Sequence, residues 1–570
     1  MSDKTRDVYI TRNAGASKGF YLTQTPEGKR YTKSQTQDST PPLPTAESRG
    51  GLPAQPLEWI SQSWHRGAGY NDHADKHRFS QSLGVDPREY GVLQLAQLPV
   101  TCTGAMTSNA DRYYEYSVGS LHCAAGTQLW KLTGTTWALA GTTAQNITSL
   151  ASINGRLAVG QASGNFYLWD NVTLTQKGVA REKFYVDRSV LWGSSGQTIY
   201  STDDPTDDDL WTTGITIGET GSDITNLRVF NSYLFTLKTD GAYKVQPDGT
   251  VRCLWDGKKF IDAENGKHAV VWRNNLIFSV AGGSLLMLTS SDIVVDVSPS
   301  TWGDYDVGVC NGLAETPNYL LAVFGTDLWA GWLEVVDSSH TMRWFKITDE
   351  PTCEGIHWYD DKIFYGKTTA TNYIPFVMTP DHTTVGRTTG WLETSNYDGG
   401  FPGRDKVWHT LKWNLPTCPA STSVKFEYSA DGGAYVTITT VSATSGYGSQ
   451  TITPFKAKQV RIKATLTGTG ATASPTVKWM KLEGYTLPKT DVVFEFEVRC
   501  EDEDGVRGWE LSDHLFAAAT DDLPPTLVDP RGTSYLIRFD PGYPREVYRA
   551  EEGENPQLVC QVRAWEIRGA

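Results

Sequence analysis

The sequence lacks any long apolar segment. No run approaches the roughly 18 apolar residues that a membrane-spanning helix needs, and the first residues lack the basic-then-apolar pattern of a secretory signal peptide. We therefore expect no membrane insertion, and we expect the chain to be made in a cytoplasm.

Closely spaced cysteine pairs are also missing. The eight cysteines are scattered without a C-x-x-C pair, at Cys102, Cys123, Cys253, Cys310, Cys353, Cys418, Cys500 and Cys560. Since neither a disulfide framework nor a zinc site fits this spacing, we expect ordinary buried thiols.

The chain has no excess of basic residues. It carries 51 Lys and Arg against 65 Asp and Glu, which gives a formal net charge of -14. Binding to nucleic acid needs a basic face that neutralises phosphate groups. The charge balance therefore argues against a nucleic-acid partner.

The usual catalytic sequence patterns are not found. The chain has neither a Walker A loop nor an H-E-x-x-H pair, and no G-x-S-x-G or Rossmann fingerprint lies on a predicted strand–turn–helix. We therefore assign no catalytic, cofactor-binding or metal residue, and we expect no enzyme and no cofactor. One alternative stays open, because a glycosidase needs only two carboxylates about 5 to 10 Å apart.

Glycine and tryptophan, in contrast, are plentiful. The 570 residues include 54 Gly and 20 Trp. Many tight turns and many large aromatic side chains favour an all-β protein. The length exceeds that of one ordinary core, so we expect two to four domains.

A repeat of strand-like segments runs from about residue 113 to 385. Each unit has an apolar run, a turn of Asn, Asp or Gly, and a second run that begins near a Leu or Ile. A period near 40 is typical of β-propeller blades, which bury both faces only by stacking in a ring. We predict a propeller of about seven blades, with its lead-in segment, over residues 58–389. The repeated positions, 34 to 45 residues apart, are Leu121, Leu157, Leu191, Leu234, Leu276, Leu321 and Ile363.

Two further β-rich regions follow the repeat. Segments that alternate at period two predict a β-sandwich over 390–488 and a small β-rich docking domain over 489–570. In the docking domain, "ELSDHLFAAA" is the one short helix that we predict. The run "VVFEFEVRC" places four apolar side chains on one face, those of Phe494, Phe496, Val498 and Cys500.

Residues 1–57 are expected to form a separate, extended N-terminal arm. The stretch "SQTQDSTPPLPTAESRGGLPAQP" is rich in Pro, Ser, Thr and Gln and offers almost nothing apolar to a core. We expect the arm to become ordered on a neighbouring subunit, with a loose terminus as the alternative. Its deletion should leave the rest of the chain folded.

Three histidines form a candidate metal cluster. His65, His73 and His77 lie close together in the sequence, and the last two would share a face if the segment were helical. The surrounding glycines disfavour a stable helix, so we assign no metal site.

One turn is a candidate binding surface. The stretch "TSNYDGGF" presents Tyr397 and Phe401 in a turn where aromatic rings would be exposed. Exposed rings of this kind stack on sugars. We therefore regard Tyr397 and Phe401 as candidate surface residues for a host glycan.

Three parts of the chain together resemble structural proteins of tailed bacteriophages. The segment "SQSWHRGAGYNDHADKHRFSQSLGVDPREYGVLQLAQLP" is similar to the lead-in of such proteins, although Glu89-Tyr90-Gly91 stands where Pro-Gly is commoner. The degenerate propeller is the second part. The third is "GWLETSNYDGGFPGRDKVWHTLKWNLP" with "SPTVKWMKLEGY", which is similar to a β-sandwich that follows such propellers. The similarity covers about residues 60 to 540.

The resemblance implies a virion protein of the tail tip, baseplate or nozzle, made and assembled in the host bacterial cytoplasm. We expect a non-enzymatic structural subunit in a symmetric homo-oligomer within the particle. Its arm and C-terminal domain would join other tail or baseplate proteins, with the propeller as a rigid platform. The alternative is a propeller protein that binds or cleaves a host cell-surface glycan.

Overall fold

Strands dominate the structure and confirm the all-β prediction. Among the described residues, α1 (Gly508–Thr520) is the one α-helix, and it coincides with the predicted helical segment. The chain divides into two compact units, residues 57–484 and residues 1–56 with 485–570. The computed structural model describes residues 6–12, 17–25, 28–29, 31–37, 56–68, 77–104, 106–117, 120–257, 261–299, 307–336, 339–349, 354–367, 370–376, 386–400, 405–469, 473–486, 490–500, 507–520, 525–540, 542–549 and 557–566.

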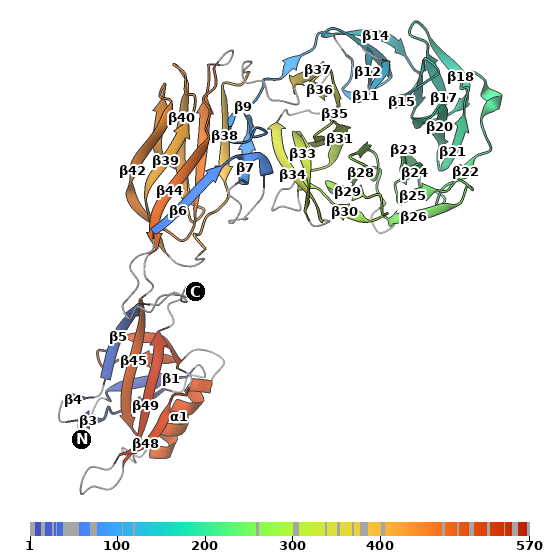
Figure 1. Cartoon of the computed structure of the whole chain (residues 1–570). Helices are drawn as coiled ribbons and strands as arrows, with labels where there is room; N and C mark the ends of the chain where they lie inside the picture. The colour runs from blue at the N-terminus through green and yellow to red at the C-terminus, as the bar shows by residue number, and fades with distance from the viewer. Residues whose placement is uncertain are drawn as a thin grey trace. The chain divides into compact units, whose positions relative to one another are not determined.

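The larger unit contains a β-propeller, as predicted. Seven four-stranded antiparallel sheets follow one another in the described chain, and Figure 1 shows them arranged in a ring. The first strand of each sheet contacts the first strand of the next, and the last of these strands contacts the first again, which closes the ring. These strands are β11 (Ala110–Ser117), β15 (Ile147–Ile153), β19 (Phe184–Asp187), β23 (Ile224–Phe230), β27 (Ala269–Trp272), β31 (Cys310–Glu315) and β35 (Glu354–Tyr359).

Each sheet continues away from the ring axis through hairpins. The second strands are β12 (Ser120–Ala125), β16 (Arg156–Gln161), β20 (Val190–Ser195), β24 (Tyr233–Lys238), β28 (Asn275–Val280), β32 (Leu320–Phe324) and β36 (Lys362–Lys367). The third strands are β13 (Gln128–Thr133), β17 (Asn165–Trp169), β21 (Thr198–Thr202), β25 (Gly241–Val245), β29 (Ser284–Leu288), β33 (Asp327–Val336) and β37 (Ala370–Pro375). The fourth strands are β14 (Thr136–Thr142), β18 (Leu174–Ala180), β22 (Ile215–Thr216), β26 (Val251–Asp256), β30 (Val294–Asp296), β34 (Ser339–Thr348) and β10 (Val100–Thr101).

The last sheet is completed by β10, a strand that precedes the first sheet in the sequence. Val100 lies opposite Tyr373 of β37 in this antiparallel pair. The Cys102 N–H then donates to the Thr371 carbonyl at 2.9 Å. Backbone hydrogen bonds therefore join the beginning of the ring to its end.

Tight turns between first and second strands explain the repeat that the sequence shows. A type I′ hairpin turn needs positive φ at both central residues, and its twist matches that of the two strands. The same backbone requirement recurs in successive sheets, although the residues differ. In five of them both central residues have φ between 47° and 79°, at Asn154-Gly155, Arg188-Ser189, Asn231-Ser232, Arg273-Asn274 and Asp360-Asp361.

Neighbouring propeller sheets bury their faces against each other. In one cluster, Phe235 and Leu237 of β24 pack with Ala269 of β27 and Phe278 of β28. Burial of apolar surface contributes about 25 cal/mol per Å². A single sheet has no partner for its two faces, so the ring is the unit that folds.

Two further sheets in the larger unit share one hydrophobic core. Their strand orders are β41-β40-β43-β38-β7 and β42-β39-β44-β6. The lead-in was predicted to belong with the propeller, but it supplies β6 and β7, so the predicted domain boundary is wrong. Pairing between strands so distant in sequence leaves no local signal. The strands are β6 (Pro56–Gln62), β7 (Phe79–Leu83), β38 (Thr389–Thr394), β39 (Lys406–Leu415), β40 (Ser423–Ala430), β41 (Val436–Ser442), β42 (Gly446–Ala457), β43 (Val460–Thr467) and β44 (Trp479–Thr486).

The lead-in connects these two sheets to the propeller through its backbone. The Ala68 N–H donates to the Trp344 carbonyl of β34 at 2.7 Å, and the Phe79 N–H donates to the Gly67 carbonyl at 3.3 Å. Gly67 has φ near +78°, and a Cβ at this position would lie 2.6 Å from the Trp344 oxygen. The approach of the two backbones therefore requires glycine.

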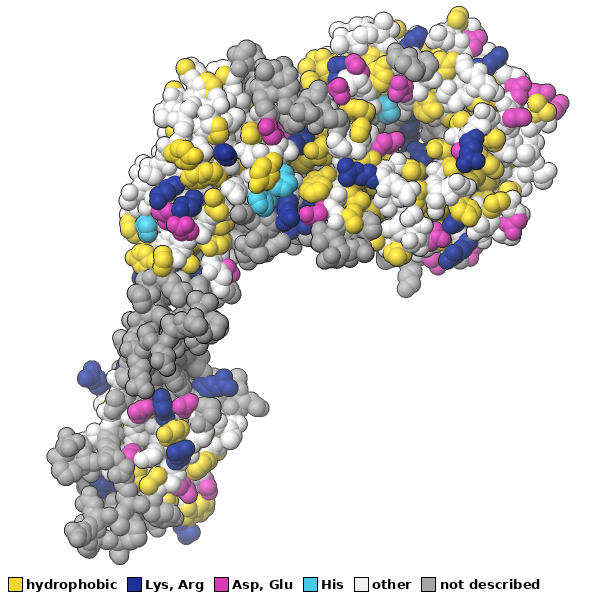
Figure 2. Space-filling model, in the orientation of Figure 1, with side chains coloured by type: hydrophobic (Ala, Val, Ile, Leu, Met, Phe, Trp, Pro, Cys, Tyr) yellow, Lys and Arg dark blue, Asp and Glu magenta, His cyan; other side chains and the backbone are white. Residues whose placement is uncertain are grey.

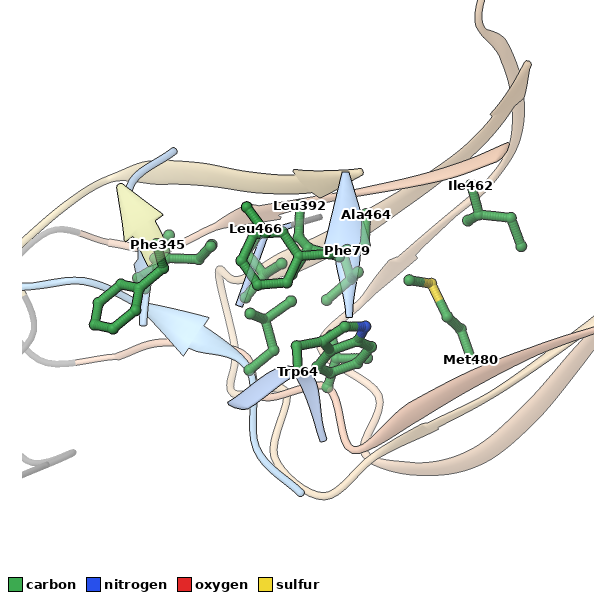
Figure 3. Packing of buried hydrophobic residues seen from close by; sticks show 14 of the residues in the cluster. Trp64, Phe79, Phe345, Leu392, Ile462, Ala464, Leu466 and Met480 are labelled. Carbon is green, nitrogen blue, oxygen red and sulfur yellow. The ribbon is translucent and has the colours of Figure 1, made fainter. Parts of the chain in front are cut away.

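One hydrophobic core runs through this connection. The Trp64 indole is fully buried and donates to the Ser61 hydroxyl at 2.7 Å. Figure 3 shows Trp64 and Phe79 in a cluster that also contains Phe345 of the propeller and Leu392 of β38. Propeller and paired sheets thus pack as one body.

The second unit is built from both ends of the chain. Its eight-stranded sheet follows the order β2-β1-β46-β47-β49-β45-β5, with β48 also on β49. The Thr23 N–H donates to the Glu497 carbonyl and the Arg499 N–H to the Tyr21 carbonyl, so the segment after β2 returns to β45 and the sheet curls on itself. The strands are β1 (Val8–Thr11), β2 (Ser17–Phe20), β5 (Tyr31–Gln37), β45 (Thr490–Arg499), β46 (Thr526–Val528), β47 (Ser534–Phe539), β48 (Arg545–Arg549) and β49 (Gln557–Glu566).

The separate arm predicted for residues 1–57 is therefore wrong for the part that is described. β1 pairs with β46 and β5 pairs with β45. Four apolar side chains from this segment enter the core beside α1 and the predicted apolar face of β45; they are Val8, Ile10, Phe20 and Leu22. The prediction gave weight to the Pro-rich composition further along and overlooked the short alternating pattern at β1.

We predict that Ile10→Ala destabilises the terminal unit by about 2–5 kcal/mol, because it removes a fully buried side chain and leaves a cavity. Thr11→Ala is the matched control on the same strand, since the Thr11 hydroxyl makes an exposed hydrogen bond to Ser17. Calorimetry of the full chain measures both. Equal, small effects of the two substitutions would contradict the core position of β1.

Candidate functional site

The first strands of the seven sheets surround a channel along the propeller axis. Residues from all seven line a cavity of about 420 Å³. Figure 2 shows Lys or Arg and His side chains inside the hollow at the centre of the ring. A cavity of this volume is within the usual range for small-ligand sites.

Four basic side chains line this channel. Arg112 lies on β11 and Arg228 on β23, while Lys183 and Lys267 precede β19 and β27. These positions alternate with residues that pack between the sheets, because successive side chains of a strand point to opposite faces. We call the four residues the channel cations.

Arg228 is held in place by its own strand and the next sheet. Its Nε donates to the Ala269 carbonyl at 2.9 Å, and Nη1 donates to the Asn226 side-chain oxygen at 2.7 Å. Its guanidinium lies 5.5 Å from the centre of the Tyr185 ring. Burial lowers the pKa of Arg228, while Tyr185 and Glu315 favour the charged form.

Lys183 is the least supported of the channel cations. Its Nζ has no hydrogen-bond acceptor or ion-pair partner within the described part of the chain. Burial is the larger cause and the positive charge of Arg112 the next, and together with the other nearby charges they lower the pKa of Lys183 to about 8. Glu182 and Asp111 act in the opposite direction.

The other two channel cations have local partners. Arg112 donates from Nη1 to the Asp111 carbonyl at 2.8 Å and from Nε to the Thr148 carbonyl at 3.3 Å. Lys267 forms an ion pair with Glu264 at 2.8 Å. These contacts hold both side chains at the channel wall. The Arg112 contacts are to neutral carbonyls, so only the charge of Lys267 is paired.

Glu315 is the one carboxylate among the described residues that line the cavity. Its side chain is open to the channel, but the surrounding sheets exclude bulk solvent, and this burial raises the pKa of Glu315. A glycosidase of the usual type needs a pair of acids. The described lining supplies only one member of such a pair.

Two histidines, His357 in the channel lining and the buried His268 next to Lys267 in the chain, are held in the neutral form. Burial lowers the pKa of His357 to about 4. Burial also lowers the pKa of His268, and all four channel cations act on it in the same direction. At neutral pH the histidines therefore add no positive charge.

The predicted surface residue Tyr397 packs against other aromatic rings. It is half-buried, and its ring stacks on Trp59 with centroids 5.1 Å apart and lies 5.8 Å from Trp408. Phe401, the second predicted residue, lies outside the described residues. Stacking on Trp59 occupies one face of the Tyr397 ring, and glycan binding at this turn stays a prediction.

The histidines of the lead-in are partly described. The rings of His65 and His77 lie 5.3 Å apart, and each ring has a nitrogen near a backbone carbonyl, that of Ser63 and Gln62 respectively. His73 lies outside the described residues. No cluster of three candidate metal ligands occurs within the described part of the chain.

Most of the described cysteines are buried free thiols, as predicted, and Cys253 is exposed. The Sγ atoms of Cys500 and Cys560 lie 3.4 Å apart on the neighbouring strands β45 and β49. Cys353 lies outside the described residues.

The channel cations were not predicted from the sequence. A signal exists, because basic residues recur at or just before the first strand of several repeats in an otherwise acidic chain. The repeat alone does not say which face of each strand points to the axis. Ring closure settles that choice.

Comparison with protein families and with curated proteins gives no match. Among solved structures, YCF48 bound to the D1 peptide is similar with a TM-score of 0.40 and 13% identity, over 50% of this chain and 97% of that one. The WD40 β-propeller domain of Doa1 is similar with a TM-score of 0.35 and 11% identity, over 49% and 96% of the chains. The extracellular domain of BT4673 from B. thetaiotaomicron has a TM-score of 0.39 and 10% identity, over 52% and 44%. These likenesses concern the fold alone.

The structure also bears on the membrane prediction. Within the described residues, no helix has the length and apolarity needed to cross a membrane.

We predict that Lys183→Met raises the free energy of unfolding at pH 7 by about 1–2 kcal/mol. The substitution removes a confined ammonium, and partial opening to the channel reduces the gain below the value that the whole pKa shift implies. The gain is complete below pH 8, where folded and unfolded chains both carry the proton. It disappears as the pH rises toward the ordinary lysine value of 10.5, because the folded chain then loses the proton first.

Urea unfolding at pH 7 and pH 10 measures this difference. Arg156→Met is the control, because Arg156 is an exposed cation of the same propeller outside the channel lining. A Lys183→Met variant that is less stable than the original chain at pH 7 would show that the ammonium stabilises the fold.

Proposed function

We propose that the chain is a non-enzymatic structural subunit of a tailed-bacteriophage tail, at the tip, baseplate or nozzle. The observation that carries the proposal is the division of the chain into two compact units, each with its own hydrophobic core. Residues 57–484 join a closed propeller to two paired sheets through one core, and the two ends of the chain form a second compact unit. The lead-in motifs that resemble tail proteins lie in the first body.

Two compact units of this kind suit a subunit that connects neighbouring tail proteins. A rigid body keeps its surfaces in fixed geometry, so it serves as a platform on which other subunits dock. The terminal unit would attach the chain to other tail or baseplate proteins in a symmetric homo-oligomer. The attachment would be made by a folded domain and not by the extended arm that the sequence predicts for residues 1–57.

The proposal predicts that the chain is a constituent of washed virions. Quantitative mass spectrometry of purified particles should find it at a fixed whole-number copy number per particle. Cryo-electron microscopy should place its propeller ring within the tail. A chain that is abundant in the infected-cell lysate but absent from washed particles would overturn the proposal.

A second candidate function is the binding of a host glycan, and one observation favours it. Tyr447 is 81% exposed on β42, and its ring lies 6.0 Å from that of Trp479 on β44. An exposed tyrosine beside a half-buried tryptophan on a sheet suits stacking against a sugar ring. This pair has more free surface than Tyr397, which packs on Trp59.

If the glycan reading holds, Tyr447→Ala should abolish binding of the full chain to host polysaccharide on an array. Val172→Ala is the control, because Val172 is 81% exposed at a propeller turn. Equal glycan binding by both variants and the unsubstituted chain would contradict a glycan site at Tyr447 and Trp479.

A further inference from the structure

The propeller channel has a charge opposite to that of the chain. Four channel cations and one carboxylate, Glu315, line the cavity; Glu264 pairs with one of the cations, Lys267, and the lining His357 is neutral. The whole chain has a formal net charge of -14. A concentration of positive charge inside a narrow, partly desolvated space attracts anions more strongly than the same charges would on an open surface.

The channel cations line one cavity, and they act on one another electrostatically. Arg112 and Lys267 both disfavour the charged form of Lys183, and Arg112 also disfavours that of Arg228. Holding like charges together costs stability unless a counter-charge is present. Glu182 and Asp111 favour the charged form of Lys183, but neither is within ion-pair distance of it in the described part of the chain. An anion in the channel would supply the counter-charge.

We propose that the channel binds a small organic polyanion that carries phosphate or carboxylate groups. Arginine donates to either group through its planar guanidinium, and Arg228 still has its Nη2 for this, because its Nε and Nη1 donate to Ala269, Asn226 and Leu227. Arg228 is already oriented by Ala269 and Asn226, so little side-chain freedom is lost when a ligand binds. Three or more positive charges favour a ligand with several negative ones, and the cavity of about 420 Å³ is larger than a single inorganic ion requires.

This inference goes beyond the proposed tail function and does not depend on it. A structural subunit with an occupied channel would be stabilised by its ligand, because binding only to the folded state raises stability. The presence or absence of the chain in virions says nothing about the channel. A negative result for the tail function would leave the anion site in the channel standing, and the reverse also holds.

Isothermal titration calorimetry of the full chain tests the proposal. Tripolyphosphate and citrate are the two probes at constant ionic strength, and they distinguish phosphate from carboxylate chemistry. We expect at least one of them to bind with one-to-one stoichiometry. Lys183→Gln and Arg228→Gln should each weaken that binding at least tenfold, while Arg156→Gln, which removes an equal charge outside the lining, should change it less than twofold.

Three outcomes would overturn the proposal: no binding of either probe at millimolar concentration, unchanged binding in Lys183→Gln, or an equal loss in Arg156→Gln. The Lys183 variant decides the matter if Arg228→Gln fails to fold, because the Lys183 ammonium makes no described hydrogen bond that the fold would lose. Circular dichroism of each variant establishes folding before titration.

Discussion

The need of each propeller sheet to bury two faces is the constraint on which the larger unit depends. A four-stranded sheet with apolar residues on both sides is not stable alone, so each sheet relies on its neighbours. The pairing of β10 with β37 completes this arrangement, because it joins residues before the first sheet to the last one. The same lead-in then continues through Gly67 and Ala68 into the paired sheets.

Ring closure also creates the chemistry of the channel. Residues that are tens of positions apart, such as Arg112, Lys183 and Arg228, come to face one axis only because their strands occupy equivalent places in successive sheets. Their proximity disfavours their charged forms, and the described chain does not fully compensate this. Stability sacrificed at one place in a well-packed fold is typical of a site that binds something.

The terminal unit follows a different logic. It brings β1, β2 and β5 from the beginning of the chain into one sheet with strands from the end, and its core mixes side chains from both. Two of its strand pairs, β1 with β46 and β5 with β45, join residues more than 450 positions apart, as with Tyr31 opposite Phe496. This domain therefore cannot form until the strands β45 to β49 have been synthesised.

The sequence by itself determined the all-β class, the propeller repeat, the helix α1 and the apolar face of β45, because these depend on local turn chemistry and on period-two alternation. Asn231-Ser232 shows this well, since the positive φ of a type I′ turn is a local requirement. Only the tertiary structure decided the partners of β6, β7 and the N-terminal strands, the packing of Tyr397 on Trp59, and the meeting of the channel cations. Each of these depends on contacts between residues far apart in the chain, and no short stretch of sequence carries information about them.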